Sequence, residues 1–278
     1  DGDTLGGSLS LFRAVFFKEV PNGFGINWEF DHSKLSTLRS ILRNRSLRYR
    51  ASEADLPTTV RITKSISMGG DAQEIYDRAL LSLRAARGNV TALKNEFMCM
   101  RQISSGFIGY KDDTTGKSAQ SEFTDKPKLE LLLDLLQRIT PEAKAVVYNE
   151  YTFSGSMICR ELRKLEIEHA RIYGGTKDTQ AELLKFVKDE DCRVLVLNHH
   201  AGSMGLNLQV AQYVIYYESP VSPRVRMQAD ARVARQGSKH ERVFIYDLVS
   251  GTVDKAILLM HRDGKDLLAG ILDGSTQL

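Results

Sequence analysis

"VLVLNHHAGSMGLNLQ", residues 194–209, is the stretch that decides the fold. It begins as an apolar run, passes through adjacent histidines, and continues into a segment that contains two glycines. A short apolar run followed by turn residues is typical of a strand that is buried on both faces, as in a parallel sheet. Glycines directly after such a strand let the backbone approach a ligand, but a turn that only starts a helix gives the same pattern. The stretch predicts a parallel sheet and leaves open what its turn binds.

The histidines and cysteines of the chain do not indicate a metal site. Adjacent residues of a strand point to opposite faces, so His199 and His200 cannot readily chelate one ion from extended backbone. Cys99, Cys159 and Cys192 stand far apart and at no spacing typical of metal ligands. We therefore expect no metal ligands in the chain and reduced thiols, as in an intracellular protein.

Around this stretch, apolar strands alternate with amphipathic helices. The first helix has apolar residues at helical spacing from Leu129, with Asp125 placed to cap it and Pro127 in its first turn. Such alternation predicts an open parallel α/β sheet with helices on both faces, which we assign to residues 127–278. Ligands of these sheets bind at the carboxyl ends of the strands. The expected strands are 144–149, 169–172, 193–198, 212–217 and 242–249, and the expected helices are 127–139, 153–165, 178–188, 224–235 and one from 253 that weakens near Gly264.

Residues 1–126 are less regular. Residues 38–50 are strongly basic, 58–68 resemble a strand, and 111–121 are polar and predict a loop. Two segments, 71–86 and 90–103, have helical character. We expect a mainly helical segment in front of the α/β domain.

Composition is that of a globular chain with 42% apolar and 26% charged residues. The net charge of +3 is compatible with nucleic-acid binding without requiring it. No run reaches the roughly 18 apolar residues that a membrane span needs, and we expect no membrane partner. Asp1 in place of a starting Met is compatible with a piece excised from a longer protein.

"QADARVARQGS", residues 228–238, places Gln228, Arg232 and Arg235 at i, i+4 and i+7, on one face of the expected helix. Neighbouring arginines repel each other, so the pair suits an anionic partner such as phosphate or carboxylate. The alternative is a solvated basic face that pairs with Asp230 and Glu241. Spacing alone leaves both interpretations open.

A triphosphate-binding loop is not recognisable in the chain. Residues 114–118, "TTGKS", resemble the end of a P-loop, but Lys111 stands where the first glycine is needed and no apolar strand precedes it. The segment predicts a polar loop.

In this order, the segments resemble the second RecA-like lobe of superfamily-two helicases, and especially the Swi/Snf-type remodelling ATPases with their bacterial and phage relatives. Weaker similarity reaches upstream, so the resemblance covers about residues 47–272. Where the family has Ser-Gln in its fourth motif this chain has Asn149 and Glu150, whose carboxylate we expect to repel a phosphate. The fifth motif is matched by Ala201, Gly202, Gly205, Leu206, Asn207 and Leu208, the sixth by Gln228, Ala229, Arg232, Arg235 and Gly237, and the closing segment by Thr252, Val253 and Asp254.

The resemblance implies half of an ATP-driven motor. ATP would lie between two lobes, and the other lobe would carry the P-loop and hold most of the ATP and Mg²⁺. Arg235 is implied as the arginine finger and Arg232 as its partner on the phosphates. Gln228 would order the cleft, with Gly205 and Asn207 near the ribose. We expect this chain alone to be inactive as an ATPase.

The resemblance also implies partners: the N-terminal RecA-like lobe of the same protein and double-stranded DNA, bound without regard to sequence. Gly174, Gly175 and His200 are the expected DNA contacts. Residues 1–126 would then comprise the end of the first lobe, the interlobe linker and a protrusion. The cell compartment would be the cytoplasm, nucleoid or host cytoplasm, or the nucleus in a eukaryote.

Two other functions remain open at this point. One is a non-catalytic module with a degenerate helicase lobe that binds nucleic acid or a protein partner. The other is a dinucleotide-dependent α/β enzyme, although the chain has no G-x-G-x-x-G segment and its paired arginines do not favour this class.

Overall fold

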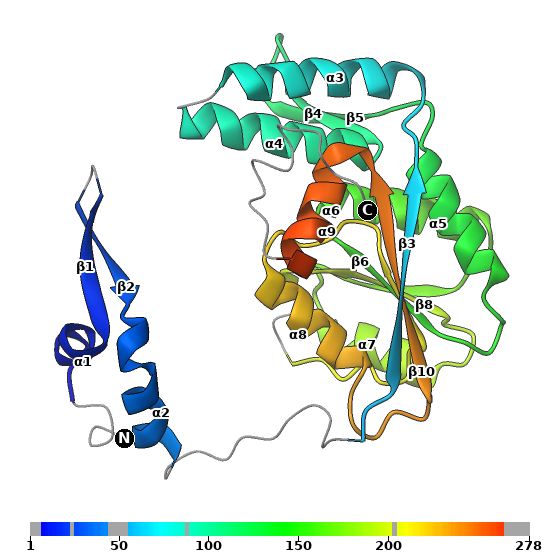
Figure 1. Ribbon diagram of the computed structural model, residues 1–278. Helices are drawn as coiled ribbons and strands as arrows, with labels where there is room; N and C mark the ends of the chain where they lie inside the picture. The colour runs from blue at the N-terminus through cyan, green and yellow to red at the C-terminus, as the bar shows by residue number, and fades with distance from the viewer. Residues whose placement is uncertain (1–6, 23–24, 44–54, 87–88, 202–204, 264–278) are drawn as a thin grey trace. The chain divides into compact units, whose positions relative to one another are not determined.

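The computed structural model describes residues 7–22, 25–43, 55–86, 89–201 and 205–263 (Figure 1). The chain divides into two compact units, residues 1–54 and 55–278. Each unit has its own secondary structure. The expected weakening near Gly264, and Gly202 and Ser203 of the decisive stretch, lie outside the described residues.

The first unit is a small helix and hairpin arrangement. Helix α1 spans Leu9–Phe16 and begins at Ser8, whose side chain accepts a hydrogen bond from the backbone of Leu11. Strands β1 (Phe17–Asn22) and β2 (Gly25–Phe30) pair antiparallel, and a 3₁₀ turn at His32–Lys34 leads into α2 (Leu35–Arg43). The basic stretch of residues 38–50 is thus helical up to Arg43, and the rest of it lies outside the described residues.

The second unit is built on a six-stranded parallel sheet in the order β3-β10-β9-β6-β8-β7. Its strands are β3 (Thr58–Ile66), β6 (Ala145–Asn149), β7 (His169–Ile172), β8 (Val194–Asn198), β9 (Tyr213–Tyr216) and β10 (Arg242–Ser250). The strands β6 and β8 are fully buried, as their apolar sequences predict. The sequence places all six strands within one or two residues of where they lie.

Helices cover both faces of this sheet. Alternate strand residues point to opposite faces, so Val147 packs with α5 (Pro127–Arg138) and α6 (Thr152–Lys164), while Val146 packs with α7 (Thr179–Lys188) and α8 (Pro223–Val233). The predicted open α/β sheet with helices on both faces is therefore confirmed.

A third cluster of buried residues joins the helices that precede and follow the sheet. Helices α3 (Gly70–Ala85) and α4 (Val90–Ser104) pack against each other and against α9 (Gly251–Asp263). Helix α4 leads into the antiparallel hairpin β4 (Phe107–Lys111) and β5 (Ser118–Glu122). Helices α3 and α4 confirm the helical character predicted there.

Three local predictions are wrong. Residues 111–121 are not simply a loop, because 118–122 form a strand paired with β4. Asp125 does not cap α5, which begins after Lys126 with no side-chain cap. Helix α8 ends at Val233, two residues before Arg235.

The boundary at residue 127 stays a prediction. The sheet takes one strand, β3, from before that boundary, and β3 pairs with β10 along nine residues. None of the helices in the described part of the chain has the length and apolarity that a bilayer crossing requires.

Candidate functional site

A small pocket lies where strands β6 and β8 end against helix α8. Its volume is about 140 Å³. Three predicted site residues, His200, Gln228 and Arg232, line it together. This is the carboxyl edge of the parallel sheet, where ligands of such folds bind. The remaining lining residues are Tyr148, His199, Val225 and Ala229.

The turn after β8 is attached to the end of α8. The backbone N–H of Leu208 donates to the carbonyl of Arg232 at 3.1 Å. Gly205 has a φ of 61°, which a residue with a side chain rarely adopts, and both Gly205 and Asn207 are exposed. The structure thus brings the segment of Gly205 and Asn207 next to the predicted arginine pair.

Arg235 lies beyond the helix, so the prediction that it shares a helical face with Gln228 and Arg232 is wrong. The carbonyl of Arg232 accepts from Leu208, and the N–H of Arg235 donates to Val233 in a tighter turn. Gly237, with a φ of 85°, completes that turn. Arg235 is exposed and Arg232 is half-buried, and neither side chain forms an ion pair with any described residue.

Asp230 is not the partner of these arginines. Its carboxylate accepts hydrogen bonds from Arg61 and from the hydroxyl of Tyr216, each at 2.7 Å. The expected pairing of this basic face with Asp230 is therefore not formed, and no ion pair with Glu241 is found among the described residues.

A row of stacked side chains, the buried stack, forms the floor beneath the pocket: Tyr148, His199, Tyr216 and Arg226. The rings of Tyr148 and His199 lie parallel with centroids 5.2 Å apart, and those of Tyr148 and Tyr216 are 5.0 Å apart. The guanidinium of Arg226 lies 3.4 Å from the Tyr216 centroid and forms an ion pair with Asp247 at 2.6 Å. The stack gives the pocket a rigid floor.

His199 is a neutral member of this floor. Its Nε2 donates to the carbonyl of Glu218 at 2.8 Å, and burial lowers the pKa of its imidazole to about 4. Burial also raises the pKa of the Glu218 carboxyl, which accepts from the backbone of Glu150. The sequence does not predict that His199 is buried and bonded to Glu218, because two adjacent histidines give no indication of which one is buried.

Glu150 has two cationic or polar neighbours. Its carboxylate lies 2.9 Å from Nε2 of the exposed His200 and 3.7 Å from the buried guanidinium of Arg101. The repulsion of phosphate expected from Glu150 is thus offset by Arg101. Arg101 lies in the segment 100–104, "MRQIS". The sequence does not predict its contact with Glu150, because the two residues are far apart in the chain.

Gly174 and Gly175 lie in an exposed turn after β7 and do not line the pocket. The turn is closed by the hydroxyl of Thr176, which accepts from the backbone of Tyr173 at 2.9 Å. A Cβ on Gly175 would lie 2.7 Å from the Tyr173 ring, so a larger residue there would displace that ring. The turn shares the carboxyl edge of the sheet with His200.

Comparison with known proteins identifies the domain. The profile of the helicase conserved C-terminal domain matches residues 127–237. Residues 127–237 form a helicase C-terminal domain. The matched residues contain the pocket, the turn after β8 and Arg235.

Relatives of this helicase domain include the yeast nuclear protein STH1/NPS1 from Saccharomyces cerevisiae, 26% identical over 248 residues, which are 81% of this chain and 18% of the yeast protein. The probable ATP-dependent DNA helicase CHR23 of Arabidopsis thaliana is 27% identical over 263 residues, 86% of this chain and 24% of the plant protein. The chain therefore spans about a fifth of the length of these relatives.

Solved structures show the same fold. The C-terminal part of the Fun30 ATPase domain superposes with a TM-score of 0.64 at 18% identity and covers 79% of this chain and 98% of that one. The SWI2/SNF2 ATPase core of Sulfolobus solfataricus in complex with dsDNA gives a TM-score of 0.59 at 19% identity, covering 99% of this chain and 58% of that one.

Proposed function

We propose that this chain supplies the C-terminal half of an ATP-dependent DNA translocase. The observation that carries the proposal is the pair Arg232 and Arg235, which lie at the end of α8 and just beyond it, without ion-pair partners among the described residues. A folded protein normally neutralises or solvates its cations, and two neighbouring arginines left available suit a polyanion.

Arg235 acts as the arginine finger and Arg232 holds the phosphates beside it. A guanidinium that reaches charge developing on the transferred phosphoryl group accelerates related reactions by about 10³–10⁵-fold. The exposed position of Arg235, outside the helix and in a turn, is suited to reach across a cleft. The charge, planarity and availability of the two side chains fit the phosphates of ATP.

Gln228, Gly205 and Asn207 contact the rest of the nucleotide. Gln228 lines the pocket, and the exposed Gly205 and Asn207 lie on the segment bonded to Arg232. A pocket of about 140 Å³ is below the roughly 300–1,000 Å³ typical of a complete ligand site. We infer that this chain contacts only part of ATP, and that Mg²⁺ and most of the nucleotide are bound by an N-terminal RecA-like lobe.

Double-stranded DNA is the second partner, contacted at Gly174, Gly175 and His200. The two exposed glycines allow the backbone N–H groups to approach phosphates, and His200 is exposed at the same edge of the sheet. Contacts of this kind read the DNA backbone and not the bases, so binding is independent of sequence. Residues 1–126 serve as interlobe linker and protrusion, and the protein works on intracellular DNA.

The test is Arg235→Ala in the protein that contains both lobes. Because a finger stabilises charge that exists only in the transition state, its loss reduces the rate of DNA-stimulated ATP hydrolysis and leaves ATP and DNA affinity largely unchanged. We expect turnover to fall by about 10³-fold. Arg235→Lys recovers little, since an ammonium does not reproduce the planar donor fork.

The matched control is Arg138→Ala, which removes an exposed arginine of α5 that pairs with Asp134. Normal turnover is expected. A folded Arg235→Ala protein that hydrolyses ATP at the normal rate contradicts the finger and favours the non-catalytic binding module. DNA-stimulated turnover by the 278-residue chain alone would contradict the half-motor proposal.

A further inference from the structure

Arg101 is a buried cation that reaches from helix α4 to the carboxyl edge of the sheet. Its side chain is 3% exposed, and its Nη2 donates to the carbonyl of Ser219, just after β9, at 2.8 Å. The guanidinium also lies over the rings of Phe97 and Tyr151, 5.9 and 5.7 Å from their centroids. These contacts fix the guanidinium in one place beside Glu150.

Glu150 connects Arg101 to His200. One carboxylate oxygen lies 3.7 Å from Arg101 and the other lies 2.9 Å from Nε2 of His200. The side chain of Asn198 holds the backbones of Glu150 and His200 together. Its Nδ2 donates to the carbonyl of Glu150 at 2.6 Å, and its Oδ1 accepts from the N–H of His200 at 3.0 Å. The carboxylate thus has a cation on its buried side and an imidazole on its exposed side.

The His200 side chain needs such a support. It is 74% exposed, and its hydrogen bond to Glu150 favours one of its rotamers. With Nε2 held by Glu150, the other ring nitrogen, Nδ1, is left to face a ligand, and both nitrogens are donors when the ring is protonated. The support resembles the carboxylate that orients a functional histidine in many sites.

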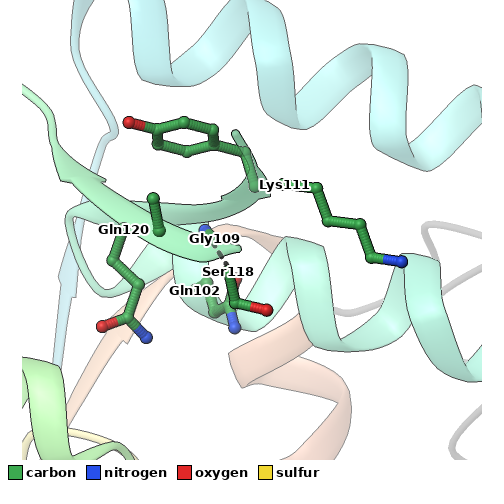
Figure 2. A pocket seen from close by; sticks show the side chains of 7 residues that line it. Gln102, Gly109, Lys111, Ser118 and Gln120 are labelled. Atoms are coloured by element: carbon green, nitrogen blue, oxygen red, sulfur yellow. Dashed lines mark hydrogen bonds between the residues drawn. The ribbon is translucent and has the colours of Figure 1, made fainter. Parts of the chain in front are cut away.

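The end of helix α4, which carries Arg101, is held in place by hydrogen bonds on two sides. The residue after Arg101, Gln102, accepts a hydrogen bond from the backbone of Gly109 in strand β4 at 3.0 Å (Figure 2). A Cβ on Gly109 would lie 3.1 Å from that same amide oxygen. On the sheet side, the hydroxyl of Tyr217 donates to the carbonyl of Ser105 at 2.7 Å. Arg101 is therefore anchored between the hairpin and the sheet.

We propose that Arg101 is a positioning residue for His200 and acts through Glu150. It couples the helical segment of α3 and α4 to the DNA-facing edge of the helicase domain. The inference rests on the proposed contact between His200 and DNA, and it adds a residue that touches neither DNA nor ATP.

The experiment is a double-mutant cycle in the protein that contains both lobes. Arg101→Ala and His200→Ala are made singly and together, and the DNA concentration that gives half-maximal ATPase stimulation is measured for each. We expect each single change to raise that concentration about tenfold, and Arg101→Ala to keep maximal turnover within about twofold of normal. The double variant should also show about a tenfold rise, because the two residues act as a unit.

Arg101→Lys should recover part of the loss, since its ammonium can approach Glu150 without making the second bond to Ser219. Glu150→Gln keeps the size of the side chain and removes its charge, so it replaces Arg101→Ala in the experiment if that variant does not fold. Glu150→Gln should raise the half-maximal DNA concentration by the same tenfold. It should cause no further rise in a protein that already carries His200→Ala. The matched control is Arg160→Ala, an exposed arginine of α6 that pairs with Glu122 and Glu161, and its curve should be normal.

Two outcomes overturn the inference. Independent effects, about 100-fold in the double variant, would show that Arg101 does not act through His200. A fall in maximal turnover with an unchanged half-maximal DNA concentration would show that Arg101 only stabilises the fold. Failure of the proposed function itself is distinguishable, because then the unmodified protein shows no DNA stimulation at all.

Discussion

Helix α8 carries two kinds of arginine. Arg226, in its first half, is buried, stacks on Tyr216 and pairs with Asp247. Arg232, less than two turns further on, and Arg235, just past the helix, form no ion pair within the described part of the chain. The difference teaches that the charge of an arginine does not indicate its role until its partners are known. Arg226 holds the sheet and the helix together, whereas the other two are available to a ligand.

The adjacent histidines repeat this contrast. His199 belongs to the buried stack and is 6% exposed, while the side chain of His200 is 74% exposed and bonded to Glu150. Changes in the buried stack should therefore alter stability, and changes at the exposed residues should alter function.

The largest effect is expected for Arg226→Ala. It leaves Asp247 buried without its cation and removes the guanidinium from Tyr216, so the free energy of unfolding should fall by about 3–5 kcal/mol. Urea denaturation measures this fall. Arg224→Ala, an exposed arginine of the same helix, is the control and should change the free energy by less than about 0.5 kcal/mol. A loss below about 1 kcal/mol for Arg226→Ala would contradict its role as a structural cation.

Stability should also depend on pH through His199. Its folded pKa is about 4 against an ordinary 6.5, so between these values the unfolded chain binds a proton that the folded chain does not. The stabilisation is complete above pH 6.5 and is lost as pH falls toward 4, by about 3 kcal/mol. Denaturation across this range should show the slope in the unmodified chain and a flatter one in His199→Phe.

The control for this experiment is Met227→Ala, which removes an exposed side chain that has no titratable group. That variant should keep the slope of the unmodified chain. An equal slope in His199→Phe would assign the pH dependence to other groups, such as the half-buried His261, whose pKa is also lowered by burial.

A smaller effect, on activity alone, is expected for Arg232→Ala in the protein with both lobes. Loss of a guanidinium on the phosphates should lower turnover by about 100-fold, the scale reported for one electrostatic donor. The free energy of unfolding of the chain should stay within about 0.5 kcal/mol of normal. Steady-state kinetics measures the effect on turnover, and urea denaturation of the same variant measures the effect on stability. A large loss of stability with normal turnover would show that Arg232 is a structural residue like Arg226.

The smallest change concerns DNA affinity. Binding should be equal for unrelated duplex sequences and should weaken steeply as salt is raised, because phosphate neutralisation supplies most of the free energy. Arg235→Ala should shift the dissociation constant by no more than about twofold, since we propose that this residue acts on ATP and not on DNA. Fluorescence anisotropy across a salt series tests both points, and a strong preference for one sequence would indicate base reading.

Part of the site was predictable because its signals are local. The pocket does contain His200, Gln228 and Arg232, and the turn of Gly205 is bonded to the helix of Arg232. The end of α8 was not predictable, because Ala, Arg and Gln are good helix formers. It ends early as the carbonyl of Arg232 accepts from Leu208, a residue far along the chain.

The hairpin and the start of α5 were missed for the same kind of reason. Residues 118–122 have no apolar alternation, and they form a strand because β4 pairs with them and Gln102 anchors β4. The carboxylate of Asp125 lies close to Gly69 and Gly70 and makes no cap for α5. Contacts between separate segments override a local signal in both cases.

The sequence by itself determined the parallel sheet, its helices and the order of the helicase motifs, since apolar periodicity and turn residues act between neighbours in the chain. Only the tertiary structure decided which charges are satisfied. Arg226 meets Asp247 and Arg61 meets Asp230 across separate elements, and Arg101 meets Glu150 across the sheet edge. Such pairs depend on distances that exist only after folding, and they distinguish the paired arginines from Arg232 and Arg235, which have no ion pair among the described residues.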